Sequence, residues 1–266
     1  MALLKRLTLL LSMGLSACAC PPAVAPSPTT PTTSPSADHV APTEPAPSGH
    51  HEHGGHHGHG PSAEGDTRAP LVHRFDDTDP ETWAKRFESD ERDAYQKPDQ
   101  VVKAMALTTG MHVADIGTGT GYFLPRLSKA VGATGRVHAV DIAPNMVRHV
   151  KTRIVEDDLS NVSVSLALTD DPLLDARSLD RILIVNTWHH IAAREAYSQK
   201  LAEALKPGGE VFVVDFKRSS ARGPDKEHKL EPQRVVEELR AAGLEPTIDT
   251  ELLSDQYVVR AVKPVR

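Results

Sequence analysis

Short apolar runs alternate with amphipathic segments along residues 112–216, and this alternation restricts the fold more than any other feature. Strands are predicted at residues 112–116, 136–141, 162–168, 180–186 and 210–216. Helices are predicted at residues 122–131, 144–155 and 192–205. Strands that alternate with helices favour a parallel sheet of crossover units with helices on both faces. The pattern therefore predicts an α/β, doubly wound fold.

Further elements are predicted on both sides of this region. Helices at 81–92 and 98–106 precede it, and a helix at 232–242 follows it, ahead of two more strands at 245–249 and 256–262. The predicted folded domain covers residues 71–266, and residues 71–110 are expected to form an N-terminal helical lid, with Tyr95 and Gln96 near the bound ligand.

The first residues have the layout of a secretory signal peptide, with Lys5 and Arg6 ahead of a short apolar stretch. The sequence Leu15-Ser16-Ala17-Cys18 resembles the lipobox of bacterial lipoproteins, in which the cysteine is lipid-modified after cleavage. Residues 1–17 are thus expected to be a lipoprotein-type signal peptide, with a lipid anchor at Cys18. This predicts a cell-envelope location, at the outer membrane or periplasm of a Gram-negative cell. Ordinary cleavage near Ala19 remains an alternative, as does a cytoplasmic protein whose leader is not processed.

Residues 18–70 are rich in proline, threonine, serine and histidine, a composition that buries too little apolar surface to fold alone. They are predicted to be a disordered linker. Neutral imidazoles bind divalent transition metals, so weak metal binding is expected from one group of histidines. Those histidines are His50, His51, His53, His56, His57 and His59. No metal ligands are predicted in the folded domain.

Charge and cysteine content exclude several classes of function. The formal charge of −6 gives no support to a nucleic-acid-binding surface. Cys18 and Cys20 are the two cysteines of the chain, so the predicted domain has neither a disulfide framework nor a thiolate metal site.

The segment "VADIGTGTGYF", residues 113–123, follows the first predicted strand of the core. Glycines at alternate positions (Gly117, Gly119, Gly121) let the backbone approach a ligand closely. A nicotinamide cofactor favours the spacing G-x-G-x-x-G, with its pyrophosphate on a helix N-terminus. Asp115, two residues before the first glycine, would repel a pyrophosphate and suits a ligand that carries an ammonium group.

This motif resembles motif I of class I S-adenosylmethionine-dependent methyltransferases, and the resemblance extends over about residues 95–262. The sequence most resembles the small-molecule-type members (methyltransferase domain 11/25-like). The resemblance implies a Rossmann-like, seven-stranded sheet with a reversed final hairpin, S-adenosyl-L-methionine as cofactor, and Asp115 close to its methionine amino end. Asp141 would accept the ribose hydroxyls, and Ile142 would pack against the adenine.

The resemblance implies further contacts to the cofactor. An acid after the third strand would accept a hydrogen bond from the adenine amino group, and Asp170 is preferred over Asp171 for this role. A turn and cap ahead of Pro172 is the alternative for both. The complete set of cofactor-binding residues implied is Asp115, Gly117, Thr118, Gly119, Gly121, Asp141, Ile142, Asp170, Asp171 and Asn186.

Methyl transfer needs a general base only when the acceptor must lose a proton. The candidates are His189 and His190, just past the fourth strand, and His228 in the loop after the fifth. A structural or surface role is the alternative for each. Trp188 is a candidate to line the methionine or acceptor side. Basic residues in "FKRSSARGPDKEHK", at 216–229, suggest either an anionic acceptor or a solvated loop.

The predicted function is therefore methyl transfer from S-adenosylmethionine to a small-molecule acceptor. The predicted export conflicts with a cytoplasmic cofactor. A membrane-tethered, non-catalytic module that binds a ligand or a metal is accordingly the alternative.

Overall fold

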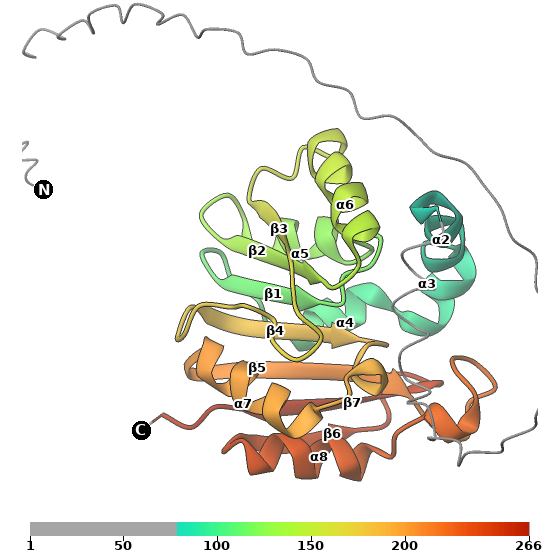
Figure 1. The fold of residues 1–266 in the computed structure, drawn as a ribbon, viewed down its shortest axis with the longest axis vertical. Helices are drawn as coiled ribbons and strands as arrows, with labels where there is room; N and C mark the ends of the chain where they lie inside the picture. The colour runs from blue at the N-terminus through green and yellow to red at the C-terminus, as the bar shows by residue number, and fades with distance from the viewer. Residues whose placement is uncertain (1–78, 266) are drawn as a thin grey trace, which may run out of the picture. The chain divides into compact units, whose positions relative to one another are not determined.

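The computed structural model describes residues 79–265, and their main feature is one seven-stranded sheet (Figure 1). The strand order is β3-β2-β1-β4-β5-β7-β6, with β7 antiparallel to both of its neighbours. The strands are β1 (His112–Ile116), β2 (Arg136–Asp141), β3 (Val162–Leu166), β4 (Leu179–Val185), β5 (Leu205–Phe216), β6 (Glu245–Asp249) and β7 (Gln256–Val262). The doubly wound α/β fold and its reversed final hairpin are confirmed.

The helices lie close to their predicted positions. They are α2 (Pro80–Phe87), α3 (Asp90–Gln96), α4 (Pro98–Ala104), α5 (Leu124–Val131), α6 (Pro144–Glu156), α7 (Arg194–Ala204) and α8 (Pro232–Ala241), with 3-10 turns η1 (Trp188–His190) and η2 (Lys226–His228). None of the helices within residues 79–265 is long and apolar enough to cross a membrane. The predicted signal peptide, Cys18, the linker and the histidines from His50 to His59 lie outside the described residues.

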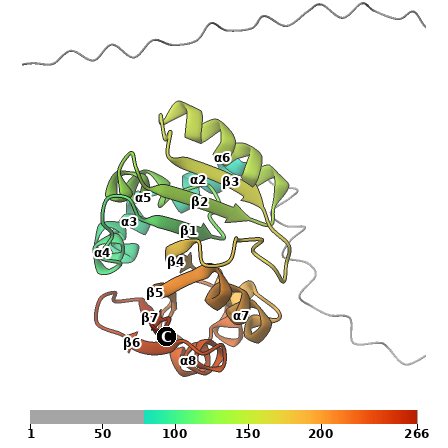
Figure 2. The ribbon, with the colours of Figure 1, turned by 90° about the vertical axis from the view of Figure 1, so that its left-hand side faces the viewer.

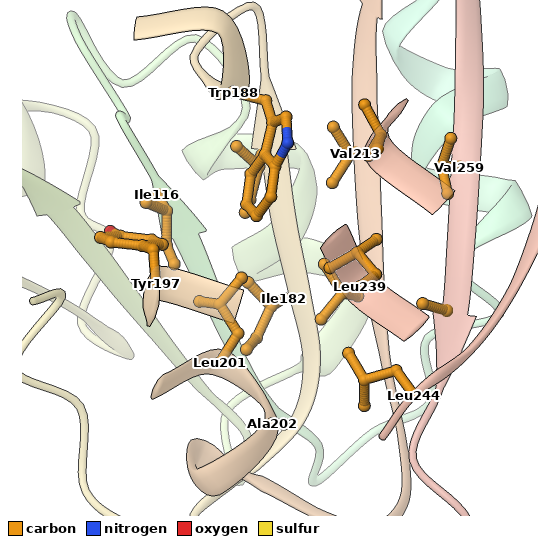
Figure 3. Packing of buried hydrophobic residues seen from close by; sticks show 14 of the residues in the cluster. Ile116, Ile182, Trp188, Tyr197, Leu201, Ala202, Val213, Leu239, Leu244 and Val259 are labelled. Carbon is orange, nitrogen blue, oxygen red and sulfur yellow. The ribbon is translucent and has the colours of Figure 1, made fainter. Parts of the chain in front are cut away.

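Helices cover both faces of the sheet, and each face has its own apolar cluster (Figure 2). On one face, Val101 of α4, Leu127 of α5 and Val150 of α6 pack against the sheet. On the other, Leu201 of α7 and Leu239 of α8 pack against Ile182, Val213 and Val259 (Figure 3). Burial on both faces explains why the central strands read as nearly continuous apolar runs.

The N-terminal lid differs from its prediction because the expected helix at 81–92 is two helices. The Ser89 hydroxyl accepts a hydrogen bond from the backbone N–H of Arg92 at 3.3 Å and so begins α3 as its N-cap. Lys97, with φ of +43°, then separates α3 from α4, and Pro98 occupies the first turn of α4. The chain therefore changes direction twice before β1.

Two strand boundaries also differ from expectation. Strand β5 begins at Leu205 and runs through Pro207-Gly208-Gly209, ahead of the predicted start at residue 210. Backbone bonds explain this, because Gly208 N–H donates to Lys263 O and Lys263 N–H to Gly209 O. Strand β3 ends at Leu166, since Leu168 N–H instead donates to Asp171 O in a turn.

Helices α2 and α3 lie at the end of the sheet where β4 finishes (Figure 1). An ion pair between Glu88 and Arg153 joins this lid to α6, and Arg153 also donates to Thr120 O at 3.0 Å. A second ion pair joins Glu91 to Arg222 in the loop after β5. The two ion pairs thus attach the lid to α6 and to the loop after β5.

Candidate functional site

The glycine loop connects β1 to α5 at the carboxyl end of the sheet, which is where open α/β sheets bind ligands. Gly117, Gly119 and Gly121 all have positive φ, at +69°, +55° and +86°. A Cβ added to Gly117 would lie 2.3 Å from Thr187 Oγ1, so this glycine lets the loop after β4 approach. A Cβ at Gly119 would meet nothing within 4 Å, which leaves open space over the loop.

Asp115, near the end of β1, is buried, with 3% of its surface exposed. Thr118 Oγ1 donates to Asp115 Oδ2 at 2.8 Å. Burial raises the pKa of Asp115 to about 6, although the Thr118 hydrogen bond and the Arg92 charge both oppose the shift. A buried acid of this kind gains stability from an added positive charge, as expected for the partner of an ammonium group.

Asp141 ends β2 beside the glycine loop, as the resemblance implies. Its Oδ2 accepts from Gly119 N–H at 2.8 Å, and its Oδ1 accepts from Ala143 N–H at 2.9 Å. The neighbouring apolar side chains of Ile142 and Leu168 are 38% and 55% exposed. Exposed apolar groups flanking an acid are suited to an adenosine, whose base is flat and whose ribose donates hydrogen bonds. Leu168 was missed from the sequence because it was assigned to the third strand, which ends at Leu166 in the structure.

The two acids after β3 differ in their surroundings. Asp171 Oδ1 accepts from Leu173 N–H at 2.8 Å, and Oδ2 lies 3.6 Å from Lys200 Nζ. This is the turn that the sequence offered as the alternative. Asp170 is exposed and stays the preferred candidate for an adenine contact.

Arg92 of α3 is a candidate that the sequence analysis missed. Its guanidinium carbon lies 4.1 Å from the centre of the Tyr122 ring, which follows Gly121. The Nη1 atom donates to Phe87 O at 2.9 Å, while Nε is buried without a hydrogen-bond partner. Burial lowers the pKa of Arg92, and the nearby Asp115 carboxylate opposes this shift. A partly buried guanidinium whose Nε has no partner, beside the glycine loop, is suited to a carboxylate ligand.

Three side-chain amides connect the lid to the sheet. Gln96 Nε2 donates to Gln256 Oε1 at 2.9 Å, and Gln256 Nε2 donates to Asn186 Oδ1 at 2.6 Å. Asn186 follows β4 and has φ of +54°, a left-handed conformation that asparagine tolerates better than most residues. The predicted roles of Gln96 and Asn186 near a ligand are thus compatible with their positions, and Gln256 is an added member from β7.

The predicted histidines gather beyond the ends of β4 and β5. His189 Nδ1 lies 2.9 and 2.8 Å from the two carboxylate oxygens of Asp215. The His190 ring centre is 4.0 Å from that of His189. Although His190 has an exposed face, the protein packed around its ring and the charges of His189 and His228 lower its pKa to about 4. His228, from η2, is close enough to His190 for its charge to contribute to this shift.

Two sequence interpretations change in the structure. Trp188 is fully buried and its Nε1 donates to Glu238 Oε2 at 2.9 Å, so it belongs to the core and not to a ligand surface. The basic loop after β5 is largely occupied by contacts within the chain. Lys217 Nζ donates to the carbonyls of Thr250, Leu253 and Ser254, while Arg218 and Arg222 pair with acids and Lys229 Nζ donates to Ser220 O. These contacts favour the structural alternative over an anionic acceptor site.

Among residues 79–265, no three histidine, cysteine, aspartate or glutamate side chains are grouped so that they could hold a metal ion.

Comparison with known proteins identifies the central part of the fold. A family model described as a methyltransferase domain matches residues 113–209, which run from β1 to the start of β5. The match includes the glycine loop, Asp115, Asp141 and the two histidines after β4.

The chain is also similar in sequence to several curated enzymes. Aklanonic acid methyltransferase from Streptomyces sp. (strain C5) is 33% identical over 105 residues, which is 39% of this chain and 47% of that protein. A demethylmenaquinone methyltransferase from Tropheryma whipplei (strain Twist) is 31% identical over 115 residues, or 43% of this chain and 45% of that protein. The chain spans about half the length of the curated relatives that it matches.

A solved structure covers more of the fold. The crystal structure of an S-adenosylmethionine-dependent methyltransferase from Aquifex aeolicus superposes with a TM-score of 0.65 and 28% identity. The alignment covers 70% of this chain and 98% of that one. The chain has the class I methyltransferase fold. The family-model match and the solved structure both indicate S-adenosylmethionine as the cofactor.

The residues around the glycine loop fit this cofactor in charge and shape. Asp115 offers a buried anion, and Arg92 offers a partly buried cation. Asp141 and Ile142 lie beside the glycine loop, where a Cβ at Gly119 would meet no atom within 4 Å. A methionine end has an ammonium and a carboxylate, and an adenosine end has ribose hydroxyls and an apolar base. Each of these groups has a complementary side chain in the site.

Proposed function

We propose that this chain is an S-adenosylmethionine-dependent methyltransferase that acts on a small-molecule acceptor. The observation that carries the proposal is the conjunction of Asp115 and the open loop at Gly119 with Asp141 at the neighbouring strand end. The matched relatives include enzymes named for aklanonic acid and demethylmenaquinone, which supports a small organic acceptor here.

Each half of the cofactor would be held by a different set of residues. Asp115 would accept from the methionine ammonium, and Arg92 Nε would donate to the methionine carboxylate. Asp141 would accept from the ribose hydroxyls, with Ile142 and Leu168 against the adenine. The bound cofactor supplies a methyl group that is electrophilic because its sulfur is a sulfonium. The protein's main contribution is then to align the acceptor and to exclude water, and the lid formed by α2 and α3 is positioned for both.

Calorimetric titration of the full chain with S-adenosylmethionine, and with its demethylated product, tests this function. Both are expected to bind the wild-type protein. Asp141→Ala is expected to weaken binding about 10- to 100-fold, because it removes a charge-assisted hydrogen bond of about 1.5–3 kcal/mol. Since Asp141 also accepts two backbone hydrogen bonds, thermal melting of the variant is measured alongside.

Asp175→Ala is the matched control, because Asp175 is exposed in the loop after β3 and is expected to leave the affinity unchanged. Absence of binding by the wild-type protein would refute the proposed function. Binding without turnover of any acceptor would favour a non-catalytic module instead.

We also propose that the protein is anchored in the cell envelope through Cys18, on the strength of the lipobox-like sequence Leu15-Ser16-Ala17-Cys18. Cells expressing the full chain are labelled with an alkyne fatty acid, and the purified protein is examined for the label. Labelling is expected for the wild type and should disappear in Cys18→Ser. A wild-type protein that takes up no label, or a Cys18→Ser protein that is still labelled, would contradict the anchor.

A further inference from the structure

The pair formed by Asp215 and His189 is buried at the ends of β5 and η1. Side-chain exposure is 1% for Asp215 and 4% for His189. Asp215 Oδ1 also accepts from the backbone N–H of Phe216 at 2.8 Å, which fixes the carboxylate in place. An ionised carboxylate can only accept hydrogen bonds, so Nδ1 of a neutral His189 carries the ring proton. Its Nε2, on the other edge of the ring, then has a lone pair available for a proton.

This pair is adjacent to the proposed cofactor loop. Thr187 lies two residues before His189, and its side chain is so close to Gly117 that no Cβ would fit between them. Strand β4 also pairs directly with β1, which places Asp115 and the start of the histidine segment at the same edge of the sheet. His189 therefore follows, by two residues, a side chain that packs directly on the glycine loop.

The groups that face the pair are neutral or structurally occupied. His190 packs on the His189 ring with its pKa lowered to about 4, so it is uncharged at neutral pH. Tyr257 of β7 is the cross-strand partner of Asp215, and its buried hydroxyl has a raised pKa caused by burial. His228 of η2 acts on His190 through its charge, and Glu238, Glu231 and Arg194 act on Tyr257. Four of the five basic residues in the following loop, Lys217, Arg218, Arg222 and Lys229, have partners within the chain.

We propose that His189, oriented by Asp215, is the general base for an uncharged acceptor with an ionisable hydroxyl, such as a phenol or a hydroquinone. This assignment rests on the proposed methyltransferase function. His189 Nε2 takes the hydroxyl proton as the acceptor oxygen forms its bond to the transferred methyl group. The electron pair of the broken sulfur–methyl bond stays on sulfur, so the sulfonium becomes a neutral thioether. Asp215 acts through His189 and is a positioning residue.

The test compares two acceptors that differ in whether their hydroxyl is already ionised. Full-length wild type and His189→Asn are supplied with S-adenosylmethionine labelled in its methyl group. One acceptor is 1,4-naphthohydroquinone, which is protonated at neutral pH, and the other is 4-nitrophenol, which is largely ionised in mild alkali. Asparagine at position 189 keeps an N–H donor for Asp215 but cannot take a proton.

His189→Asn is expected to lower transfer to naphthohydroquinone about 10²- to 10⁴-fold, the usual contribution of a general base. The loss with 4-nitrophenol at alkaline pH should be under about tenfold, because that acceptor needs no base. Calorimetric affinity for S-adenosylmethionine should stay within about twofold of wild type. His112→Asn, at the opposite end of the sheet, is the matched control and should change neither rate.

Each contrary outcome has a distinct meaning. An equal loss for both acceptors with intact cofactor binding would overturn the base assignment and leave the proposed function standing. So would a wild-type protein that binds the cofactor but methylates neither compound. A wild-type protein that binds no cofactor would overturn the proposed function and the assignment with it. If His189→Asn does not fold, Asp215→Asn answers the same question, since it should shift the pH–rate profile for naphthohydroquinone and leave cofactor affinity unchanged.

Discussion

Gly119→Ala is expected to fold as the wild type does and to bind S-adenosylmethionine at least about 100-fold more weakly. The added methyl group meets no protein atom within 4 Å, so it creates no clash in the free protein. The backbone at Gly119 has φ of +55°, and alanine in this region costs only about 1–2 kcal/mol. The methyl group would instead occupy the space that the ligand needs. The substitution therefore lowers cofactor affinity more than it lowers stability. Thermal melting and calorimetry measure the two quantities separately.

Gly117→Ala is the matched comparison, with the opposite balance of effects. Its Cβ would lie 2.3 Å from Thr187 Oγ1 and 2.4 Å from Thr187 Cγ2. Overpacking of this kind typically costs about 1–3 kcal/mol, and the left-handed backbone adds to it. The melting temperature is therefore expected to fall clearly more than in Gly119→Ala. Normal cofactor affinity in Gly119→Ala would show that the open space over the loop is not the cofactor site.

Much of this fold could be predicted because both faces of the sheet are buried and the connections are short. The positions of Asp115 and Asp141 at one edge of the sheet were predictable for the same reason. Each ends a clear apolar run, and the ends of adjacent parallel strands meet at one edge. The position of the histidines just past β4 follows from the same argument. Their connection to Asp215 could not be predicted, since Asp215 lies inside a predicted apolar strand and nothing in the sequence shows which side chain it contacts.

The elements that sequence reasoning missed depend on tertiary contacts. The break at Ser89 turns α3 so that Arg92 faces Tyr122, and nothing in a continuous helix at 81–92 would place it there. The structural use of the basic loop follows from carbonyls in the β6–β7 connection, far away in sequence. The burial of Trp188 similarly depends on Glu238 of α8, which satisfies its indole N–H. A single chain sequence contains no direct signal for such pairings.

Asp115→Asn is expected to make the free protein more stable at pH 7 while removing most of its cofactor affinity. The pKa of Asp115 is about 6 in the folded protein, above its ordinary value of 3.8. The folded state therefore holds this proton more tightly than the unfolded state, and wild-type stability falls as pH rises from about 4 to about 6. Above that range, the ionised carboxylate costs at most about 3 kcal/mol, at 1.36 kcal/mol for each pKa unit. Asparagine has no charge to bury and keeps an acceptor for Thr118.

The same substitution changes how cofactor binding depends on pH. In the wild type, affinity should fall as pH drops through about 6, because the protonated acid no longer attracts an ammonium group. Asp115→Asn should bind about 10- to 100-fold more weakly at pH 7 and lose this dependence, since a charge-assisted hydrogen bond contributes about 1.5–3 kcal/mol. Calorimetry from pH 5 to pH 8, in buffers of different ionisation enthalpy, also detects the proton that wild-type Asp115 releases on binding.

Arg92→Gln separates the two ends of the methionine. It removes the proposed carboxylate partner, so affinity should fall while the pH dependence persists. Its midpoint should move upward, because the Arg92 charge helps to keep Asp115 ionised. If Asp115→Asn binds S-adenosylmethionine as tightly as the wild type does across the pH range, the ammonium group lies elsewhere. If Asp115→Asn is more stable than the wild type and binds the cofactor more weakly, the wild-type protein keeps a buried acid at a cost in stability. It does so because that acid pairs with the positive charge of the cofactor.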